Sequence, residues 1–283
     1  MPEQFAQVAA IIIRLGNRAD SALFEKFPEL QWVVSATTGT DHIDLEAAKA
    51  RGIEVLCLRG EVAFLETIAS TAEHTWALLM SLVRRIPAAV ASVNGGSWNR
   101  DTFRGTELKG KKLGVVGLGR TGSKVASYAE AFGMTVGYVD PGVVSDAHRR
   151  FSNLKDLAGW ADVITLHVHL NNETEGMIEA SVLESLKDGA YLINTSRGRI
   201  VDEDAVARAV ESGRLAGVAT DVLATELENV TLSPLLRLAA NGANVIITPH
   251  IGGATWDAMH ATEEFMAKKL VRAIDCSRAI SGF

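Results

Sequence analysis

The stretch that decides the fold is Leu113-Gly114-Val115-Val116-Gly117-Leu118-Gly119-Arg120-Thr121-Gly122. Its apolar start predicts a buried strand, and residues 123–132 after it have the pattern of a helix. The glycines between them fit G-x-G-x-x-G, which opens a dinucleotide-binding unit. We expect Gly117 to make the tight turn, Gly119 to let the backbone approach a pyrophosphate, and Gly122 to pack the helix closely on the strand.

An acidic residue follows the glycines at the distance that this unit requires. The next apolar run, residues 134–139, ends at Asp140, which lies 18 residues after Gly122. A carboxylate there accepts hydrogen bonds from the adenosine ribose and repels a 2′-phosphate, so NAD is favoured over NADP. The alternative, a tight turn with a solvated Asp, would explain each feature separately. The order of strand, glycines, helix and acid favours the cofactor site.

Short apolar runs and amphipathic stretches alternate on both sides of this unit. Runs typical of strands lie at 10–13, 31–35, 53–58, 134–139, 163–168, 190–194, 218–222 and 245–248. Helical patterns lie between most of them, and the longest is at 71–86. This alternation predicts an α/β fold with parallel sheets that are covered on both faces.

Composition excludes several classes of protein. The 283 residues suggest about two domains. A net charge of −6 argues against a nucleic-acid partner, and no apolar run approaches the ~18 residues of a membrane helix. The two cysteines, Cys57 and Cys276, form neither a disulfide framework nor a metal motif, which favours the cytoplasm.

His167 and His169 would share a strand face, but no third ligand is evident, so no metal is expected.

Polar residues follow three of the later strands. Arg197 comes after the run at 190–194, Asp221 and Glu226 after the run at 218–222, and His250 after the run at 245–248. Ligands of open parallel sheets bind beyond the carboxyl ends of the strands, so we expect these side chains to converge on the nicotinamide. Taken singly, each is more often a surface charge or a turn residue.

These residue types suit the reduction of a 2-oxo acid. Histidine titrates near neutral pH, so His250 fits a proton donor or acceptor. A carboxylate such as Glu226 orients the imidazole and favours its protonated form. The planar fork of Arg197 fits the substrate carboxylate. Asp221 is a candidate acceptor for the nicotinamide carboxamide.

At these residues the chain resembles the D-isomer-specific 2-hydroxyacid dehydrogenase family, with a likeness to its phosphoglycerate dehydrogenases. The matching stretches are 37–44, 71–75, the glycine pattern, 190–198 and 248–253. The resemblance implies two Rossmann-like or flavodoxin-like domains with the active site in the cleft between them. Residues 1–86 with 257–283 would form the substrate domain, and residues 87–256 the NAD-binding domain.

The resemblance also implies roles for individual residues. Arg197, Glu226 and His250 would be catalytic, and the backbone of Thr38 and Gly39 would bind the substrate carboxylate together with Arg197 and His250. The implied cofactor contacts are Gly117, Gly119, Arg120, Thr121, Gly122, Asp140, Thr195, Asp221, His250 and Gly253. The family further implies a homodimer formed through the cofactor domain, near the helix at 71–86.

Two questions remain open at the level of sequence. The chain is short before the strand at residue 10, where the family usually has another strand–helix unit, so either the substrate domain lacks a strand or the sequence is incomplete at its start. The residues that select the substrate lie in that domain, and the 2-hydroxy acid is therefore not determined. The alternative function is an NAD(H)-binding sensor or corepressor-like protein on the same fold. The complete set of Arg197, Glu226 and His250 argues against it.

Overall fold

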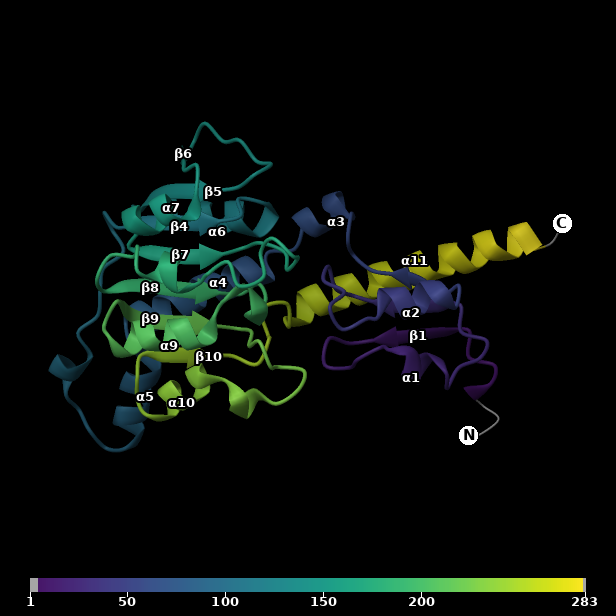
Figure 1. Cartoon of the computed structure of the whole chain (residues 1–283), viewed down its shortest axis with the longest axis horizontal. Helices are drawn as coiled ribbons and strands as arrows, with labels where there is room; N and C mark the ends of the chain where they lie inside the picture. The colour runs from purple at the N-terminus through teal and green to yellow at the C-terminus, as the bar shows by residue number, and fades with distance from the viewer. Residues whose placement is uncertain (1–4, 282–283) are drawn as a thin grey trace. The chain divides into compact units, whose positions relative to one another are not determined.

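The computed structural model describes residues 5–281, and the chain divides into two compact units. The smaller unit comprises Met1–Ile68 and Ala254–Phe283, and the larger comprises Ala69–Gly253. Each unit has its own sheet, and every strand pair in both sheets is parallel (Figure 1). The predicted α/β class with parallel sheets is confirmed.

The smaller unit is a three-stranded sheet with helices on both faces. Its elements are β1 (Ala10–Ile13), α1 (Ser21–Phe24), β2 (Trp32–Ser35), α2 (Leu45–Ala50), β3 (Glu54–Leu56), α3 (Val62–Glu66) and α11 (Trp256–Ser281), with strand order β1-β2-β3. Side chains alternate along β2: Val33 packs with Phe24 of α1, whereas Val34 packs with Met266 of α11. Within the described residues, this sheet has only three strands, and its edge strand β1 leaves Ile12 67% exposed.

The larger unit contains a seven-stranded sheet in the order β10-β9-β8-β7-β4-β5-β6. The strands are β4 (Lys112–Val116), β5 (Thr135–Val139), β6 (Arg149–Arg150), β7 (Val163–Leu166), β8 (Ala190–Asn194), β9 (Leu215–Thr220) and β10 (Val245–Ile247). The chain winds outward from β4 in one direction and from β7 in the other. The strand order therefore reverses between β4 and β7, where doubly wound sheets bind nucleotides.

Helices cover both faces of this sheet. They are α4 (Ser70–Val83), α5 (Ile86–Asn94), α6 (Arg120–Ala131), α7 (Leu154–Trp160), α8 (Ala180–Leu183), α9 (Glu203–Glu211) and α10 (Pro234–Ala240), with short 3-10 turns η2 (Arg100–Phe103), η3 (Gly198–Ile200) and η4 (Val230–Leu232). One core joins α4 and α6 to the sheet through Leu79, Val125 and Val115. The other core contains residues of α7, α8, α9 and α10, among them Leu157 of α7 and Leu238 of α10.

The first boundary between the units lies at Ile68/Ala69 and not at residue 86/87, where the resemblance places it. The reason is the packing of α4, whose Leu79 shares a core with Ile193 of β8 and Ala219 of β9. Sequence periodicity indicates an apolar helix stripe but not the sheet that it covers. The return crossing, at Gly253/Ala254, lies three residues before the predicted one.

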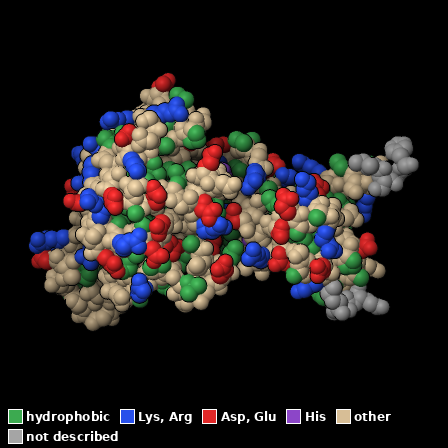
Figure 2. Space-filling view, in the orientation of Figure 1, with side chains coloured by type: hydrophobic (Ala, Val, Ile, Leu, Met, Phe, Trp, Pro, Cys, Tyr) green, Lys and Arg blue, Asp and Glu red, His purple; other side chains and the backbone are tan. Residues whose placement is uncertain are grey.

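The surface in view carries both signs of charge. Figure 2 shows Lys and Arg side chains interspersed with Asp and Glu on both units. Among residues 5–281, no single helix is long and apolar enough to cross a membrane. One bent pair, Val62–Val83 with Ile86–Asn94 at 63°, passes the same test of length and composition.

Candidate active site

The glycine turn has the geometry that its sequence suggests. Gly117 has a φ of +90°, and a Cβ there would lie 2.6 Å from the carbonyl oxygen of His167. A Cβ at Gly122 would lie 2.1 Å from the carbonyl oxygen of Gly117, so α6 lies directly on the turn. By contrast, a Cβ at Gly119 would have no protein atom within 4 Å of it. The turn is thus closed by two glycines and open above the third.

The N-terminus of α6 faces the same turn. Arg120 and Thr121 are its first residues, and its N-cap, Gly119, has no side chain to cap the helix. A helix that begins in this way presents N–H groups and positive potential to an anion. A cradle of this kind fits the pyrophosphate of a dinucleotide.

Asp140 lies beside the turn because it bonds to it. Its Oδ2 accepts from the amide of Leu118 at 2.8 Å, and its Oδ1 accepts from the amides of Gly142 and Val143, both at 2.8 Å. A carboxylate has about four acceptor positions, so three amides leave room for a further donor such as a ribose hydroxyl. The carboxylate therefore both shapes the glycine turn and is available to a nucleotide.

His167 and His169, which follow β7, differ in their surroundings. Burial lowers the pKa of His167 to about 3, so its imidazole is neutral at neutral pH, and its Nε2 lies 2.9 Å from Thr165 Oγ1. His169 is exposed. In the part of the chain that the structure describes, no group of three or more His, Cys, Asp and Glu side chains could hold a metal ion.

His250 and Glu226 form a direct pair. His250 Nδ1 lies 2.8 Å from Glu226 Oε1, and each side chain is 23% exposed. The other glutamate oxygen accepts from the amide of Leu223 at 3.2 Å, which fixes the carboxylate. Because the carboxylate accepts, hydrogen bonding assigns the proton to Nδ1 and leaves Nε2 as the nitrogen that changes protonation. A histidine held in this way suits proton transfer.

Asp221 organises the turn that carries His250. Its carboxylate is 2% exposed and accepts from the hydroxyl of Thr248 at 2.6 Å and from the amides of Ile251 and Gly252 at 2.9 and 2.7 Å. Its main-chain oxygen accepts from the amide of His250 at 2.8 Å. Burial raises the pKa of Asp221, but the hydrogen bonds outweigh burial and lower it overall. This role is separate from the nicotinamide contact expected from sequence.

The backbone of His250 is in the left-handed region, with a φ of +55°. A residue with a Cβ adopts this conformation at a cost of about 1–2 kcal/mol, so the surrounding bonds must hold it there. The bonds that the amides of His250, Ile251 and Gly252 donate to Asp221 supply this support.

Arg197 lies in the loop after β8. Asn194 Nδ2 donates to its carbonyl oxygen at 2.9 Å, and its own Nη1 donates to the carbonyl oxygen of Ser196 at 2.8 Å. A Cβ at Gly198, the next residue, would lie 2.0 Å from the carbonyl carbon of Leu223. This close approach packs the Arg197 loop against the loop that leads to Glu226.

The remaining predicted residues fall in two places. Thr195 Oγ1 lies 2.7 Å from Thr75 Oγ1 of α4, and Gly253 is exposed at the end of the larger unit. Thr38 and Gly39 belong to the smaller unit, where Thr37 Oγ1 donates to the carbonyl oxygen of Gly39 at 2.7 Å. The contacts thus join Glu226 to His250 directly and Arg197 to the Glu226 loop by backbone packing.

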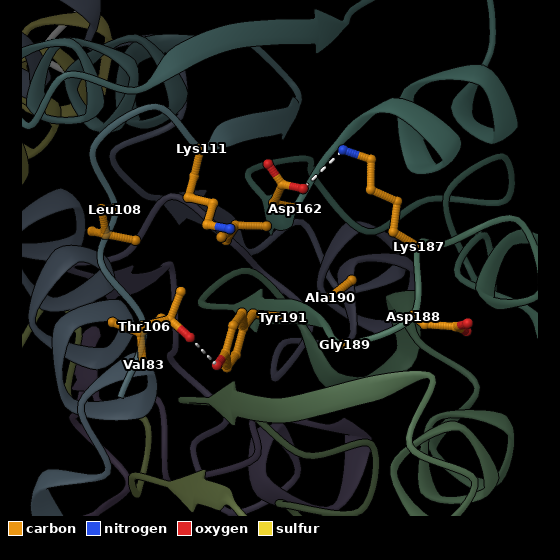
Figure 3. Close-up of a pocket in the computed structure, with 11 residues that line it drawn as sticks. Val83, Thr106, Leu108, Lys111, Asp162, Lys187, Asp188, Gly189, Ala190 and Tyr191 are labelled. Carbon is orange, nitrogen blue, oxygen red and sulfur yellow. Dashed lines mark hydrogen bonds and ion pairs between the residues drawn. The ribbon is translucent and has the colours of Figure 1, made fainter. Parts of the chain in front are cut away.

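A separate cavity of about 130 Å³ lies at the other end of the larger sheet (Figure 3). Its lining includes Val163 and Ala190, the first residues of β7 and β8. Lys187 donates to Asp162 at 2.8 Å beside it. None of the predicted site residues lines this cavity. Since it lies at the amino ends of the strands, it is not the nucleotide site.

Sequence reasoning misses two side chains that contact the strand ends. His74 and Thr248 both bond to Asp221, across 147 and 27 residues of sequence. The stretch 71–75 carries part of the resemblance to the family, but the sequence places it only in a helix near a dimer interface. No spacing rule connects a helix residue with a strand end so far along the chain.

Comparison with known proteins places the chain in a family. The family model of the D-isomer specific 2-hydroxyacid dehydrogenase, NAD binding domain, matches residues 76–252. The chain belongs to the D-isomer specific 2-hydroxyacid dehydrogenase family. The family assignment also gives NAD as its cofactor, in agreement with the open glycine turn and the position of Asp140.

Relatives within the 2-hydroxyacid dehydrogenase family extend the match over most of the chain. It is 38% identical to D-3-phosphoglycerate dehydrogenase of Bacillus subtilis over 253 residues, which are 88% of this chain and 46% of that protein. It is also 38% identical to the Rattus norvegicus enzyme of the same name over 265 residues, which cover 92% and 48%. The chain thus spans about half the length of these curated relatives.

Solved structures of the family have the same fold. D-lactate dehydrogenase from Aquifex aeolicus, crystallised with NAD and lactic acid, has a TM-score of 0.83 at 33% identity, and the match covers 97% of this chain and 85% of that one. NAD-dependent formate dehydrogenase from Staphylococcus aureus, in complex with NAD, has a TM-score of 0.82 at 28% identity, covering 96% and 80%.

Proposed function

We propose that the protein is an NAD-dependent oxidoreductase that interconverts a D-2-hydroxy acid and its 2-oxo acid. The observation that carries the proposal is the His250–Glu226 pair at 2.8 Å, at the carboxyl edge of a nucleotide-binding sheet. Membership of the 2-hydroxyacid dehydrogenase family supports it. A protein that only senses NAD(H) has no need of a fixed proton donor, so the pair favours catalysis over a sensor role.

The residues that would hold NAD are those of the open turn and the neighbouring strand ends. Gly119 leaves the space for the pyrophosphate, the amides of Arg120 and Thr121 supply its donors, and Asp140 accepts from the ribose. Gly117 and Gly122 shape this turn. Thr195, Asp221, His250 and Gly253 would lie toward the nicotinamide. The chemistry that NAD supplies when bound is the exchange of a hydride with C2 of the substrate.

The proton is moved by His250. In the reducing direction the protonated imidazole donates from Nε2 to the oxygen on C2, and in the oxidising direction the neutral imidazole accepts that proton. Glu226 holds Nδ1 throughout, so the ring keeps its orientation and the positive charge that forms is stabilised. Arg197 binds the substrate carboxylate through its guanidinium.

We also propose a cytoplasmic homodimer. Helix α5 has no buried residue, and Ile86, Val90 and Val93 on one side of it are 47%, 52% and 48% exposed. Trp98, just beyond the helix, is 90% exposed. An apolar patch of this kind is typical of a surface that a partner covers, and a second copy of the chain is the partner that the family suggests. Cys57 and Cys276 are free thiols, which is in keeping with a reducing compartment.

A panel of 2-oxo acids tests the function and identifies the substrate. NADH absorbance would be followed with glyoxylate, pyruvate, hydroxypyruvate and phosphohydroxypyruvate, with NADPH in parallel. We expect oxidation of NADH by at least one acid. Tight NADH binding without turnover of any of them would favour the sensor instead.

Sedimentation of wild-type protein and Trp98→Ala would test the dimer, since only the wild type should sediment as two copies.

A further inference from the structure

His74, on the second turn of α4, reaches the ends of two strands. Its Nε2 lies 3.2 Å from Asp221 Oδ1 and 3.0 Å from Thr248 Oγ1, and its side chain is 17% exposed. Asp221 follows β9 and Thr248 follows β10. His74 of α4 therefore bonds to Asp221 and to Thr248, and both of these residues contact the turn that carries His250.

The hydrogen bonding assigns the proton on this imidazole. The hydroxyl of Thr248 gives its single proton to Asp221 Oδ1 at 2.6 Å, and the ionised carboxylate has none to give. Nε2 of His74 must then carry a hydrogen and donate it to both oxygens. Nε2 carries this hydrogen in the protonated ring and in one neutral tautomer, so the contact does not depend on the charge of His74.

The turn held by these bonds is packed against the His74 ring. A Cβ at Gly252 would lie 3.0 Å from Asp221 Oδ2 and 3.6 Å from Cδ2 of His74. The amides of Ile251 and Gly252 both donate to the Asp221 carboxylate, and the amide of His250 donates to its main-chain oxygen. The left-handed φ of His250 therefore depends on where that carboxylate is held.

We propose that His74 is a positioning residue, which fixes Asp221 and Thr248 and so orients His250 toward Glu226 and the substrate. The inference rests on the proposed function for its catalytic consequence, whereas its structural part stands on the hydrogen bonds alone. The low pKa of Asp221 agrees with it: burial alone would raise that pKa, and the His74 bond is first among those that lower it.

Three variants separate this role from a general loss of stability. His74→Leu keeps the bulk but removes the donor, and His74→Gln restores an N–H close to the position of Nε2. His148→Leu is the matched control. His148 has a 12% exposed side chain in the same unit, and its Nδ1 lies 3.5 Å from Glu130 Oε1 on α6, which makes it a second partly buried histidine beside a carboxylate.

Amide hydrogen exchange measures the turn without any need for turnover. In His74→Leu we expect the amides of Ile251 and Gly252 to exchange about 10-fold faster. Without the bond from His74, the Asp221 carboxylate that accepts from these amides is held less firmly, so local opening of the turn costs less free energy. Peptides from β4 and α6 should be unchanged. His74→Gln should exchange as the wild type does, and His148→Leu should leave Ile251 and Gly252 unaffected. Unchanged exchange in His74→Leu, or equal acceleration throughout the unit, would overturn the proposal.

Kinetics measure the consequence for His250. With the best acid of the panel, His74→Leu should lower kcat about 10- to 100-fold, as expected for a misplaced catalytic group, with KM for NADH within about twofold of wild type. His74→Gln should recover most of kcat. Equal losses in both variants would count against positioning through the donor. If the wild type itself reduces no acid, the proposed function fails, and hydrogen exchange still decides the role of His74.

Discussion

Replacing Gly198 by alanine would test how rigidly the Arg197 and Glu226 loops are packed together. A Cβ at this position would lie 2.0 Å from the carbonyl carbon of Leu223 and 2.2 Å from the amide nitrogen of Ala224, whereas ordinary contact begins at 3.4 Å. The two backbone segments must separate by the difference between 3.4 and 2.0 Å, about 1.4 Å. Both neighbours are backbone atoms, so no side chain can rotate away.

The expected result follows from what each loop carries. Displacement of about 1 Å in a catalytic constellation costs roughly 100-fold in rate, so kcat for the best 2-oxo acid should fall by about that factor. Overpacking should also lower the free energy of unfolding by about 1–3 kcal/mol in urea. Gly16→Ala is the control, because no atom lies within 4 Å of its Cβ position. Wild-type kcat and stability in Gly198→Ala would refute the reasoning.

Three further predictions concern the cofactor, the proton and pH. Gly119→Ala should fold with unchanged stability, since no protein atom lies within 4 Å of the new methyl group, but the Kd for NADH measured by fluorescence should rise about 10-fold or more; an unchanged Kd would contradict the pyrophosphate assignment. His250→Ala should keep its affinity for NADH and lose about 10²–10⁴-fold in turnover, and turnover near that of wild type would overturn its role as proton donor. Asp221 has a lowered pKa in the fold, so its stabilisation is complete above about pH 3.8, its ordinary value, and is lost as pH falls through the lower folded value. Urea unfolding should therefore show a steeper acid loss below about pH 3.8 in the wild type than in Asp221→Asn, and parallel curves would count against this account.

The glycine stretch predicts more of the fold than any other part of the sequence. It indicates the strand at β4, the turn and the helix α6, because Gly117 and Gly122 each stand where a Cβ would clash with nearby backbone. The run at 190–194 coincides with β8 to the residue. Very short elements, such as β6 with two residues, show no readable pattern. The sequence does not predict α5 as a separate helix, and Pro87 lies in its first turn, where proline is tolerated.

Contacts between distant parts of the chain explain the other differences. Which sheet α4 covers depends on partners such as Ile193, more than 100 residues away, and this moves the boundary between the units by 18 residues. The pair of Glu226 and His250 can be anticipated from chemistry, since a histidine and a carboxylate at neighbouring strand ends suit each other. The contact of His74 with Asp221 cannot, because a helix periodicity gives a direction but no partner.

The three amide bonds of Asp140 bear on attempts to change the cofactor. A designer who wants the protein to accept a 2′-phosphate would first remove this carboxylate, since it repels the phosphate. That substitution would also release the amides of Leu118, Gly142 and Val143, which the carboxylate holds at 2.8 Å. Cofactor preference and the shape of the phosphate turn are thus encoded in a single side chain. A useful redesign must replace the lost acceptor in the turn at the same time as it supplies a cation for the phosphate.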